Sequence, residues 1–196
     1  MRRRRRSRKR VIQVLVKRLF YLIIFVAVFI LVCYLLVSPR IGKLFFPFPY
    51  REHVQASAER YSLDPLFVAA LIQTESGFRP HVVSPRGARG LMQVMPSTAE
   101  WVAQNMGIDY SPDMLFDPQY NIEIGCWYIA DLLKLFNRET AIALAAYNGG
   151  RGEVRRWLDE GVWDGRESEL EQIPFTETRN FVRQVMESYR HYQQIY

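Results

Sequence analysis

The sequence predicts a mainly α-helical domain with at most a small β-hairpin, preceded by one N-terminal transmembrane helix. Three observations predict this architecture: two Asp-Pro pairs that precede apolar stretches of helical spacing, glycines that follow such stretches, and an uncharged apolar run near the N-terminus. A chain of 196 residues has room for one domain of about 100 to 200 residues and a short appendage. We expect a basic tail over residues 1–18, a membrane anchor over 19–37, a linker over 38–51 and the folded domain over 52–196.

The predicted anchor is the run from Leu19 to Val37, which contains no charged residue, no proline and no glycine. A helix of about 20 apolar residues is long enough to cross the hydrocarbon core of a membrane. A cleaved signal peptide has a shorter apolar core, of about 7 to 15 residues, followed by small residues at the cleavage site, and no such site follows Val37. We therefore expect an uncleaved single-pass anchor in a cell membrane.

The charges on either side of this run predict its orientation. Ten Lys or Arg residues precede it, whereas only Arg40 and Lys43 follow closely. Because cytoplasmic flanks are rich in basic residues, we expect the N-terminus in the cytoplasm and the domain outside it. The formal net charge of +6 belongs to the tail, since from Phe45 onward 14 basic residues face 20 acidic ones. The tail could bind nucleic acid through phosphate contacts, but its position beside the anchor favours an orientation signal, and we expect no nucleic-acid partner.

Four aromatic residues follow the predicted anchor: Phe45, Phe46, Phe48 and Tyr50. Aromatic side chains settle at the headgroup level of membranes, but these could equally pack against the domain, and the sequence leaves both possibilities open. The two cysteines, Cys33 in the anchor and Cys126 in a helical stretch, form no disulfide framework, and we expect Cys126 to be buried. The three histidines have no metal-ligand spacing, so we expect neither a metal nor a cofactor.

The first helix of the domain is predicted to start at Asp64-Pro65, with aspartate as N-cap and proline at the first helical position. Apolar residues follow at helical spacing until Gly77 can end the helix, which places Glu75 in its last turn. Asp117-Pro118 repeats the same start signal ahead of a long apolar stretch that extends to Phe136. We expect this second stretch to be the central, buried helix.

Three further helices are predicted by their apolar spacing, the first two also by the glycines that follow them: Glu139 to Asn148, Glu153 to Glu160, and Phe175 to Tyr196. One segment of the domain is predicted to be non-helical. It runs from Val82 to Val94, with Gly87 and Gly90 as turn residues and a short strand from Leu91 to Val94.

Three motifs occur in a fixed order along the domain. The first joins Glu75-Ser76 to Ser84, to Gly-Leu-Met-Gln at 90–93 and to Met-Pro-Ser-Thr-Ala at 95–99. The second is Ala-Ala-Tyr-Asn-Gly-Gly at 145–150, and the third is Ile-Pro-Phe-Thr-Glu-Thr-Arg at 173–179. With these motifs the chain resembles, over about residues 52 to 193, the lytic transglycosylase family, whose catalytic domain shares the fold of goose-type lysozyme.

The resemblance implies a lysozyme-like helical domain that cleaves the β-1,4 bond between N-acetylmuramic acid and N-acetylglucosamine in peptidoglycan. The product would be a 1,6-anhydro sugar, and Glu75 would be the catalytic acid and base. A glutamic acid that protonates a glycosidic oxygen near neutral pH needs a pKa above its ordinary value of about 4.3. The negative end of the helix dipole and the apolar residues Leu71, Ile72 and Phe78 are both expected to raise it.

Most glycosidases use two carboxylates, whereas these motifs supply one. The resemblance implies that the 2-acetamido oxygen of the substrate serves as the nucleophile instead. It also implies six substrate-contacting residues: Ser84, Gln93, Met95, Tyr147, Asn148 and Glu177. Ser84 and Gln93 would bind substrate groups beside the acid, and Met95 would pack against a sugar. The Tyr147 hydroxyl would lie next to Glu75.

Other roles for these residues remain open from the sequence alone. Ser84 and Gln93 could cap turns, Asn148 could cap a helix end, and Glu177 could form an ion pair with Arg179 or Arg183. The sequence also departs from the family at two positions, with Gly149 where alanine is common and Phe181 where tyrosine is common. The second departure removes a hydroxyl group that could contact the substrate.

Two other functions are alternatives to the transglycosylase interpretation. A goose-type lysozyme activity on the same fold would admit water and give a reducing end, and a non-catalytic peptidoglycan-binding protein would keep the groove without the chemistry. The partners expected are peptidoglycan strands and the membrane, with any cell-wall synthesis or division protein unidentified. Cleavage from strand ends and cleavage inside strands are equally compatible with the sequence.

Overall fold

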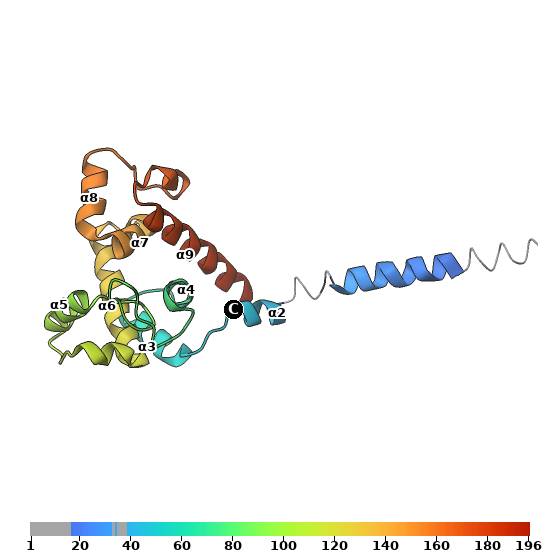
Figure 1. Ribbon diagram of the computed structural model, residues 1–196, viewed down its shortest axis with the longest axis horizontal. Helices are drawn as coiled ribbons and strands as arrows, with labels where there is room; N and C mark the ends of the chain where they lie inside the picture. Colours follow the sequence, from blue (N-terminus) through green and yellow to red (C-terminus); the bar gives the residue numbers. More distant parts are fainter. Residues whose placement is uncertain (1–16, 33, 35–38) are drawn as a thin grey trace, which may run out of the picture. The chain divides into compact units, whose positions relative to one another are not determined.

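The computed structural model describes residues 17–32, 34 and 39–196, which fall into two units, Met1–Phe45 and Phe46–Tyr196. In the first unit, residues 17–32 and 34 are helical, and a short helix α2 follows at Pro39–Phe45 (Figure 1). The predicted anchor over 19–37 includes residues 33 and 35–38, which lie outside the described residues. Within the described part, no helix combines the length and apolar character needed to span a membrane.

The second unit is built from helices alone, so the predicted mainly helical class is confirmed (Figure 1). Seven are α-helices: α3 (Arg51–Arg60), α4 (Pro65–Ser76), α5 (Pro96–Met106), α6 (Pro118–Leu135), α7 (Thr140–Gly149), α8 (Arg151–Asp159) and α9 (Thr176–Ile195). Two are short 3₁₀ helices: η1 (Pro112–Phe116) and η2 (Glu167–Gln172). Over residues 46–196 there is no strand, only isolated antiparallel bridges.

Both Asp-Pro start signals are confirmed. The Asp64 carboxylate accepts the Leu66 N–H at 2.8 Å, and the Asp117 carboxylate accepts the Tyr120 N–H at 2.8 Å, so each aspartate caps its helix. Gly77 ends α4 in the left-handed conformation with φ 57°, which costs glycine little. Glu75 therefore lies in the last turn of α4, as predicted.

The two helices with Asp-Pro starts form the centre of the fold. Six consecutive residues of α4, 67–72, are buried, because the helix packs between α9 on one side and α3 on another. Helix α6 contacts α3, α5, α7 and η1, which confirms the prediction of a central helix. Helix α7 packs against α6, α8 and α9, and it therefore connects the central helix α6 to α9, which itself packs on α4.

Several boundaries and elements differ from the prediction. Helix α7 starts at Thr140 and includes Gly149, and α8 starts at Arg151. Helices α3 and α5 were not predicted, and α2 lies within the predicted linker. Helix α3 buries only Val54, Ser57 and Ala58 among polar neighbours, so its apolar pattern in the sequence is weak.

The predicted strand from Leu91 to Val94 is wrong, because side chains satisfy this backbone where a neighbouring strand would. The Ser76 hydroxyl donates to the Leu91 carbonyl at 2.7 Å, and the Tyr147 hydroxyl donates to the Met92 carbonyl at 2.8 Å. Leu91 to Gln93 form a turn, and only Val94 pairs with Arg89 as an isolated bridge.

The Asn121 side chain fixes this turn to α6. Asn121 is 0% exposed, and its Oδ1 accepts the Met92 N–H at 2.7 Å. Its Nδ2 donates to the carbonyls of Arg89 and Leu115, both at 2.9 Å. Gly90, with φ 77°, lies so close that a Cβ there would be 2.1 Å from the Leu115 carbonyl oxygen. The turn, η1 and α6 are thus joined through one amide group.

Three of the four aromatic residues at 45–50 pack against the core of the second unit: Phe46, Phe48 and Tyr50. The Tyr192 hydroxyl near the end of α9 donates to the Pro47 carbonyl at 2.6 Å, which fastens this segment to α9. Phe45 is 71% exposed. Of the two possibilities that the sequence left open, these three residues follow the second, packing against the domain.

We predict that Asn121→Ala lowers the free energy of unfolding by about 2 to 4 kcal/mol, because it leaves buried backbone groups without partners. Urea unfolding of the full chain, followed by circular dichroism, measures the change. Asn105→Ala, at the exposed end of α5, serves as the control and should change stability by no more than about 0.5 kcal/mol. Equal effects of the two substitutions would contradict the role given to Asn121.

Candidate active site

Glu75 is the acidic residue whose surroundings suit proton donation. Leu71 and Ile72 are fully buried beside it on α4, and Phe78 is buried one turn further on. Burial, and to a lesser extent the charge of the Glu177 carboxylate, together raise the pKa of the Glu75 carboxyl to about 8. Within the described residues, no group donates a hydrogen bond to this carboxyl. Glu75 therefore keeps its proton at neutral pH.

Two predicted site residues, Ser84 and Gln93, hold the loop that follows α4. The Ser84 hydroxyl oxygen accepts the Ala88 N–H at 3.0 Å, which is the turn-capping arrangement that the sequence left open. The Gln93 side-chain nitrogen donates to the carbonyls of Val82 and Gly90, at 3.1 and 2.8 Å. The Gln93 Oε1 makes no hydrogen bond within the described part of the chain, so it remains available as an acceptor.

Four of the predicted site residues line one pocket of about 220 Å³: Gln93, Met95, Tyr147 and Asn148. We call it the tyrosine pocket; its other lining residues are Val94, Thr98, Tyr128, Gly149 and Gly150. Met95 precedes α5 and is 38% exposed, so an apolar side chain is presented at the pocket edge. Glu75, Ser84 and Glu177 do not line this pocket.

Tyr147 lines this pocket and is buried near the acid. Its ring is stacked on Phe181, with ring centres 6.4 Å apart and planes at 6°. Burial raises the pKa of the Tyr147 hydroxyl well above its usual range, and the charge of Glu75 acts in the same direction. The hydroxyl is therefore neutral and near Glu75, although it donates its hydrogen bond to the Met92 carbonyl. Phe181, where the family commonly has tyrosine, supplies the stacking surface.

Asn148 and Glu177 are connected through the start of α9. The Asn148 Oδ1 accepts the hydroxyl hydrogen of the buried Thr178 at 2.8 Å. Glu177 pairs with Arg86 of the loop at 3.0 Å, and both side chains are exposed. The alternative partners predicted for Glu177 were wrong, because Arg179 and Arg183 both pair with Glu171 instead.

Of the lining residues of the tyrosine pocket that sequence reasoning missed, two have polar side chains, Thr98 and Tyr128. Thr98 belongs to the Met-Pro-Ser-Thr-Ala motif, so its position in a motif was a usable signal. Tyr128 lies on α6 outside every motif, and its ring meets that of Tyr147 with centres 5.3 Å apart. The sequence around Tyr128 does not predict this contact, because it joins residues of two different helices.

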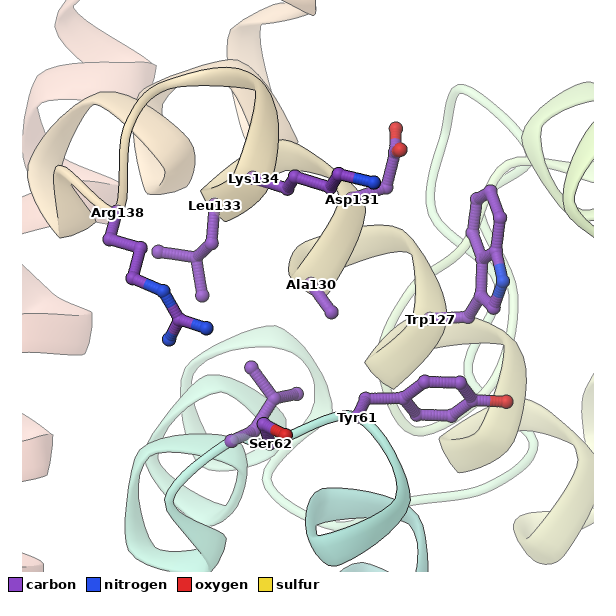
Figure 2. A pocket seen from close by; sticks show the side chains of 9 residues that line it. Tyr61, Ser62, Trp127, Ala130, Asp131, Leu133, Lys134 and Arg138 are labelled. Atoms are coloured by element: carbon purple, nitrogen blue, oxygen red, sulfur yellow. The ribbon is translucent and has the colours of Figure 1, made fainter.

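Larger pockets lie elsewhere on the domain. One of about 440 Å³ lies between the end of α3 and α6, and Figure 2 shows Tyr61 and Trp127 on one side of it and Arg138 on the other. Another, of about 350 Å³, contains Glu123. None of the predicted site residues lines either pocket.

Glu123 differs from Glu75 in its protonation. Burial alone would raise the pKa of the Glu123 carboxyl, but hydrogen bonds from the hydroxyls of Ser57 and Tyr61, together with the charge of Arg60, lower it below its ordinary value. Glu123 is therefore ionised at neutral pH. Glu75, which has no such donors, is the better general acid.

Comparisons with known proteins agree with this geometry. The family model described as "Transglycosylase SLT domain" matches residues 52–168. A soluble lytic murein transglycosylase of Salmonella typhimurium is 37% identical over 155 residues, which are 75% of this chain and 24% of that protein. A membrane-bound lytic murein transglycosylase C of Edwardsiella ictaluri is 33% identical over 169 residues, covering 74% of this chain and 47% of the other.

Among solved structures, an inactive Glu-to-Gln mutant of the lytic transglycosylase Slt from Pseudomonas aeruginosa superposes with a TM-score of 0.70 at 35% identity. The match covers 76% of this chain and 24% of that one. The chain thus spans about a quarter of the length of such soluble relatives.

We predict that the unusual pKa of Glu75 makes stability depend on pH. Because the folded state holds this proton up to about pH 8 whereas the unfolded state loses it near pH 4.5, stability should fall as pH rises between these values. Glu75→Gln should remove this slope and make the full chain about 1 to 3 kcal/mol more stable than the wild type at pH 8. Urea unfolding across this pH range is the measurement.

Glu177→Gln is the matched variant, because it removes only the charge that adds to the burial effect. It should reduce the slope without abolishing it. Parallel pH profiles for the wild type and Glu75→Gln would contradict a protonated Glu75.

Proposed function

The chain belongs to the transglycosylase SLT domain family, and on that premise we propose that it is a membrane-anchored lytic transglycosylase of peptidoglycan. It would cleave the β-1,4 bond between N-acetylmuramic acid and N-acetylglucosamine and form 1,6-anhydro-N-acetylmuramic acid. The observation that carries this proposal is Glu75, a carboxyl whose pKa is raised to about 8, chiefly by burial, and whose charge acts on Tyr147 in a pocket lined by four motif residues. The names of the relatives support the same substrate and reaction.

The proposed reaction needs one protein acid. Glu75 donates its proton to the glycosidic oxygen as the bond from that oxygen to the anomeric carbon breaks. The 2-acetamido oxygen of the substrate attacks the anomeric carbon and holds it as an oxazolinium ion. The C6 hydroxyl then attacks the same carbon, displaces the acetamido oxygen and gives its proton to the Glu75 carboxylate. The acid is regenerated and no water is consumed, so the reaction is an intramolecular transglycosylation rather than a hydrolysis.

The surroundings of Glu75 support both proton transfers of this cycle, the donation to the glycosidic oxygen and the acceptance from the C6 hydroxyl. A carboxyl that keeps its proton at neutral pH is a ready donor, and the same apolar surroundings make its carboxylate a strong base for the C6 hydroxyl. Tyr147, neutral and close to Glu75, would limit the movement of the acid without taking its proton. Gln93, Met95 and Asn148 would contact the sugars in the tyrosine pocket.

Ser84 and Glu177 would act at the edge of this site. The Ser84 oxygen accepts one backbone hydrogen bond, and its hydroxyl hydrogen can still be donated to the substrate. The Glu177 carboxylate is exposed beside Arg86, where it would meet a sugar or peptide group while helping Glu75 to keep its proton.

We also propose that residues 19–37 anchor the enzyme in a cell membrane, with the N-terminus in the cytoplasm and the catalytic domain outside. The uncharged run of residues and the basic tail before it support this arrangement. One relative described as membrane-bound supports it as well.

Product analysis tests the proposed reaction. The full chain in detergent is incubated with intact peptidoglycan, and mass spectrometry reads the released muropeptides. We expect anhydro-muropeptides from the wild type and a loss of rate of about 100-fold or more in Glu75→Gln, since a general acid contributes on that order. Glu187→Gln, an exposed glutamate on α9, is the control and should retain full activity.

The products also separate the rival functions. Muropeptides heavier by one water would identify a goose-type lysozyme-like hydrolase and overturn the proposed intramolecular transglycosylation. Binding to peptidoglycan without any product would identify a non-catalytic binding protein.

The anchor predicts that the full chain, expressed in bacteria, stays in the membrane pellet after extraction with alkaline carbonate. A variant lacking residues 19–37 should leave the pellet, since the rest of the chain contains no comparable apolar run. The full chain in the carbonate supernatant would contradict the anchor and leave the proposed chemistry untouched.

A further inference from the structure

A second pocket continues the tyrosine pocket along α5. It has a volume of about 190 Å³ and is lined by Ser97, Thr98, Trp101, Tyr128 and Arg151. Thr98 and Tyr128 line both pockets, so the two are adjacent. We call the second one the arginine pocket. None of the sequence motifs predicted a role for Trp101 or Arg151.

Arg151 brings an uncompensated positive charge to this pocket. It is the first residue of α8, and its guanidinium lies over the Trp101 ring, 4.8 Å from the ring centre. Across the part of the chain that the structure describes, no carboxylate lies within ion-pair distance of Arg151. The nearest acidic residue on its own helix, Glu153, pairs with Arg156 instead.

The position of Arg151 over the Trp101 ring leaves its hydrogen-bond donors unused. The Arg151 guanidinium makes no hydrogen bond to another residue that the structure describes, so its N–H groups remain available as donors while it lies over the ring. These donors match the two oxygens of a carboxylate, which can accept two parallel hydrogen bonds. An arginine held in this way favours an anionic group over a neutral sugar hydroxyl.

The rest of the pocket suits a sugar that carries such a group. Trp101 is half-buried and held by edge-to-face contacts with Trp127 and Tyr128, at 5.3 and 6.4 Å between ring centres. A fixed aromatic ring offers apolar surface at little entropic cost. The hydroxyls of Ser97 and Thr98 add polar groups on the first turn of α5.

We propose that the arginine pocket is an extension of the cleft that binds a carboxylate-bearing muramyl unit of the glycan strand, with Arg151 as the residue that binds the carboxylate. The inference rests on the proposed function, because the strand that fills the tyrosine pocket is the one that reaches the arginine pocket. The carboxylate has two sources, the peptide attached to the muramyl lactyl group or the lactyl group itself when the peptide has been removed. Arg151 is thus a specificity-determining residue.

Binding measurements in the inactive background test this proposal without turnover. The full chain with Glu75→Gln, and the same chain with Arg151→Gln added, are titrated with three kinds of soluble glycan strand. One carries intact peptides, one carries peptides whose carboxylates have been converted to amides, and one has lost its peptides to an amidase. We expect Arg151→Gln to weaken binding of the intact strand about threefold to tenfold and to leave the amide-converted strand unaffected.

The strand without peptides identifies the source of the carboxylate, because amidase treatment exposes the lactyl carboxylate. If Arg151→Gln weakens binding of this strand, the lactyl carboxylate is a ligand of Arg151. If Arg151→Gln weakens binding of the intact strand only, the ligand is a carboxylate of the peptide. Arg151→Lys keeps the charge without the planar fork and should give an intermediate affinity. Arg155→Gln removes the same charge one turn further along α8, lines neither pocket, and should leave all three affinities unchanged.

Two results would overturn the inference. One is an Arg151→Gln variant, folded by circular dichroism, that binds all three strands as tightly as its parent. The other is an equal loss of affinity for the intact and the amide-converted strand, which would make the contribution of Arg151 structural. If the wild type still releases anhydro-muropeptides in either case, the proposed function stands and only the carboxylate site falls. An absence of both binding and products would overturn both.

Discussion

The buried amide of Asn121 is the contact on which the arrangement of the site depends. It binds the backbone on both sides of Gly90, and so holds Leu91 and Met92 in a turn whose carbonyls point toward other helices. The Leu91 carbonyl then receives a hydrogen bond from the residue after Glu75, and the Met92 carbonyl receives one from Tyr147. Two consecutive carbonyls thus join α4, which carries the acid, to α7, which carries the tyrosine. A polar group buried this deeply must be fully paired, and the pairing specifies one geometry.

Two glutamates of this domain are half-buried and yet have opposite properties. Glu123 receives two hydroxyl hydrogen bonds and the charge of Arg60, so it is ionised. Glu75 has apolar neighbours, and the carboxylate of Glu177 adds to the effect of burial on its pKa, so it stays protonated. The difference comes from the donors around each carboxyl rather than from burial itself. Proton donation therefore depends on an absence of hydrogen-bond donors, which is a property of the tertiary structure.

Local signals in the sequence predicted what local forces determine. The Asp-Pro pairs and Gly77 predicted both ends of α4 and the position of Glu75, because capping involves residues only a few positions apart. The strand predicted from Leu91 to Val94 was wrong, because the partners of that backbone are side chains 15 to 55 residues away in sequence. The motifs brought four site residues to one pocket, whereas Tyr128, and the pairing of Glu177 with Arg86, depend on contacts between distant elements.

The attachment of the segment before α3 to the end of α9 has a mechanical consequence. Phe46 and Phe48 pack against Tyr192, whose hydroxyl also holds the Pro47 carbonyl. Tension applied through the chain before residue 46 would therefore enter the domain at the last turns of α9, a helix that packs along α4 and whose first turn carries Glu177. A domain tethered at its N-terminus to one structure while it holds a strand of another would bear such a load along α9. The contacts of Phe46, Pro47 and Phe48 with Tyr192 would then keep this force from acting directly on the turn that holds Glu75.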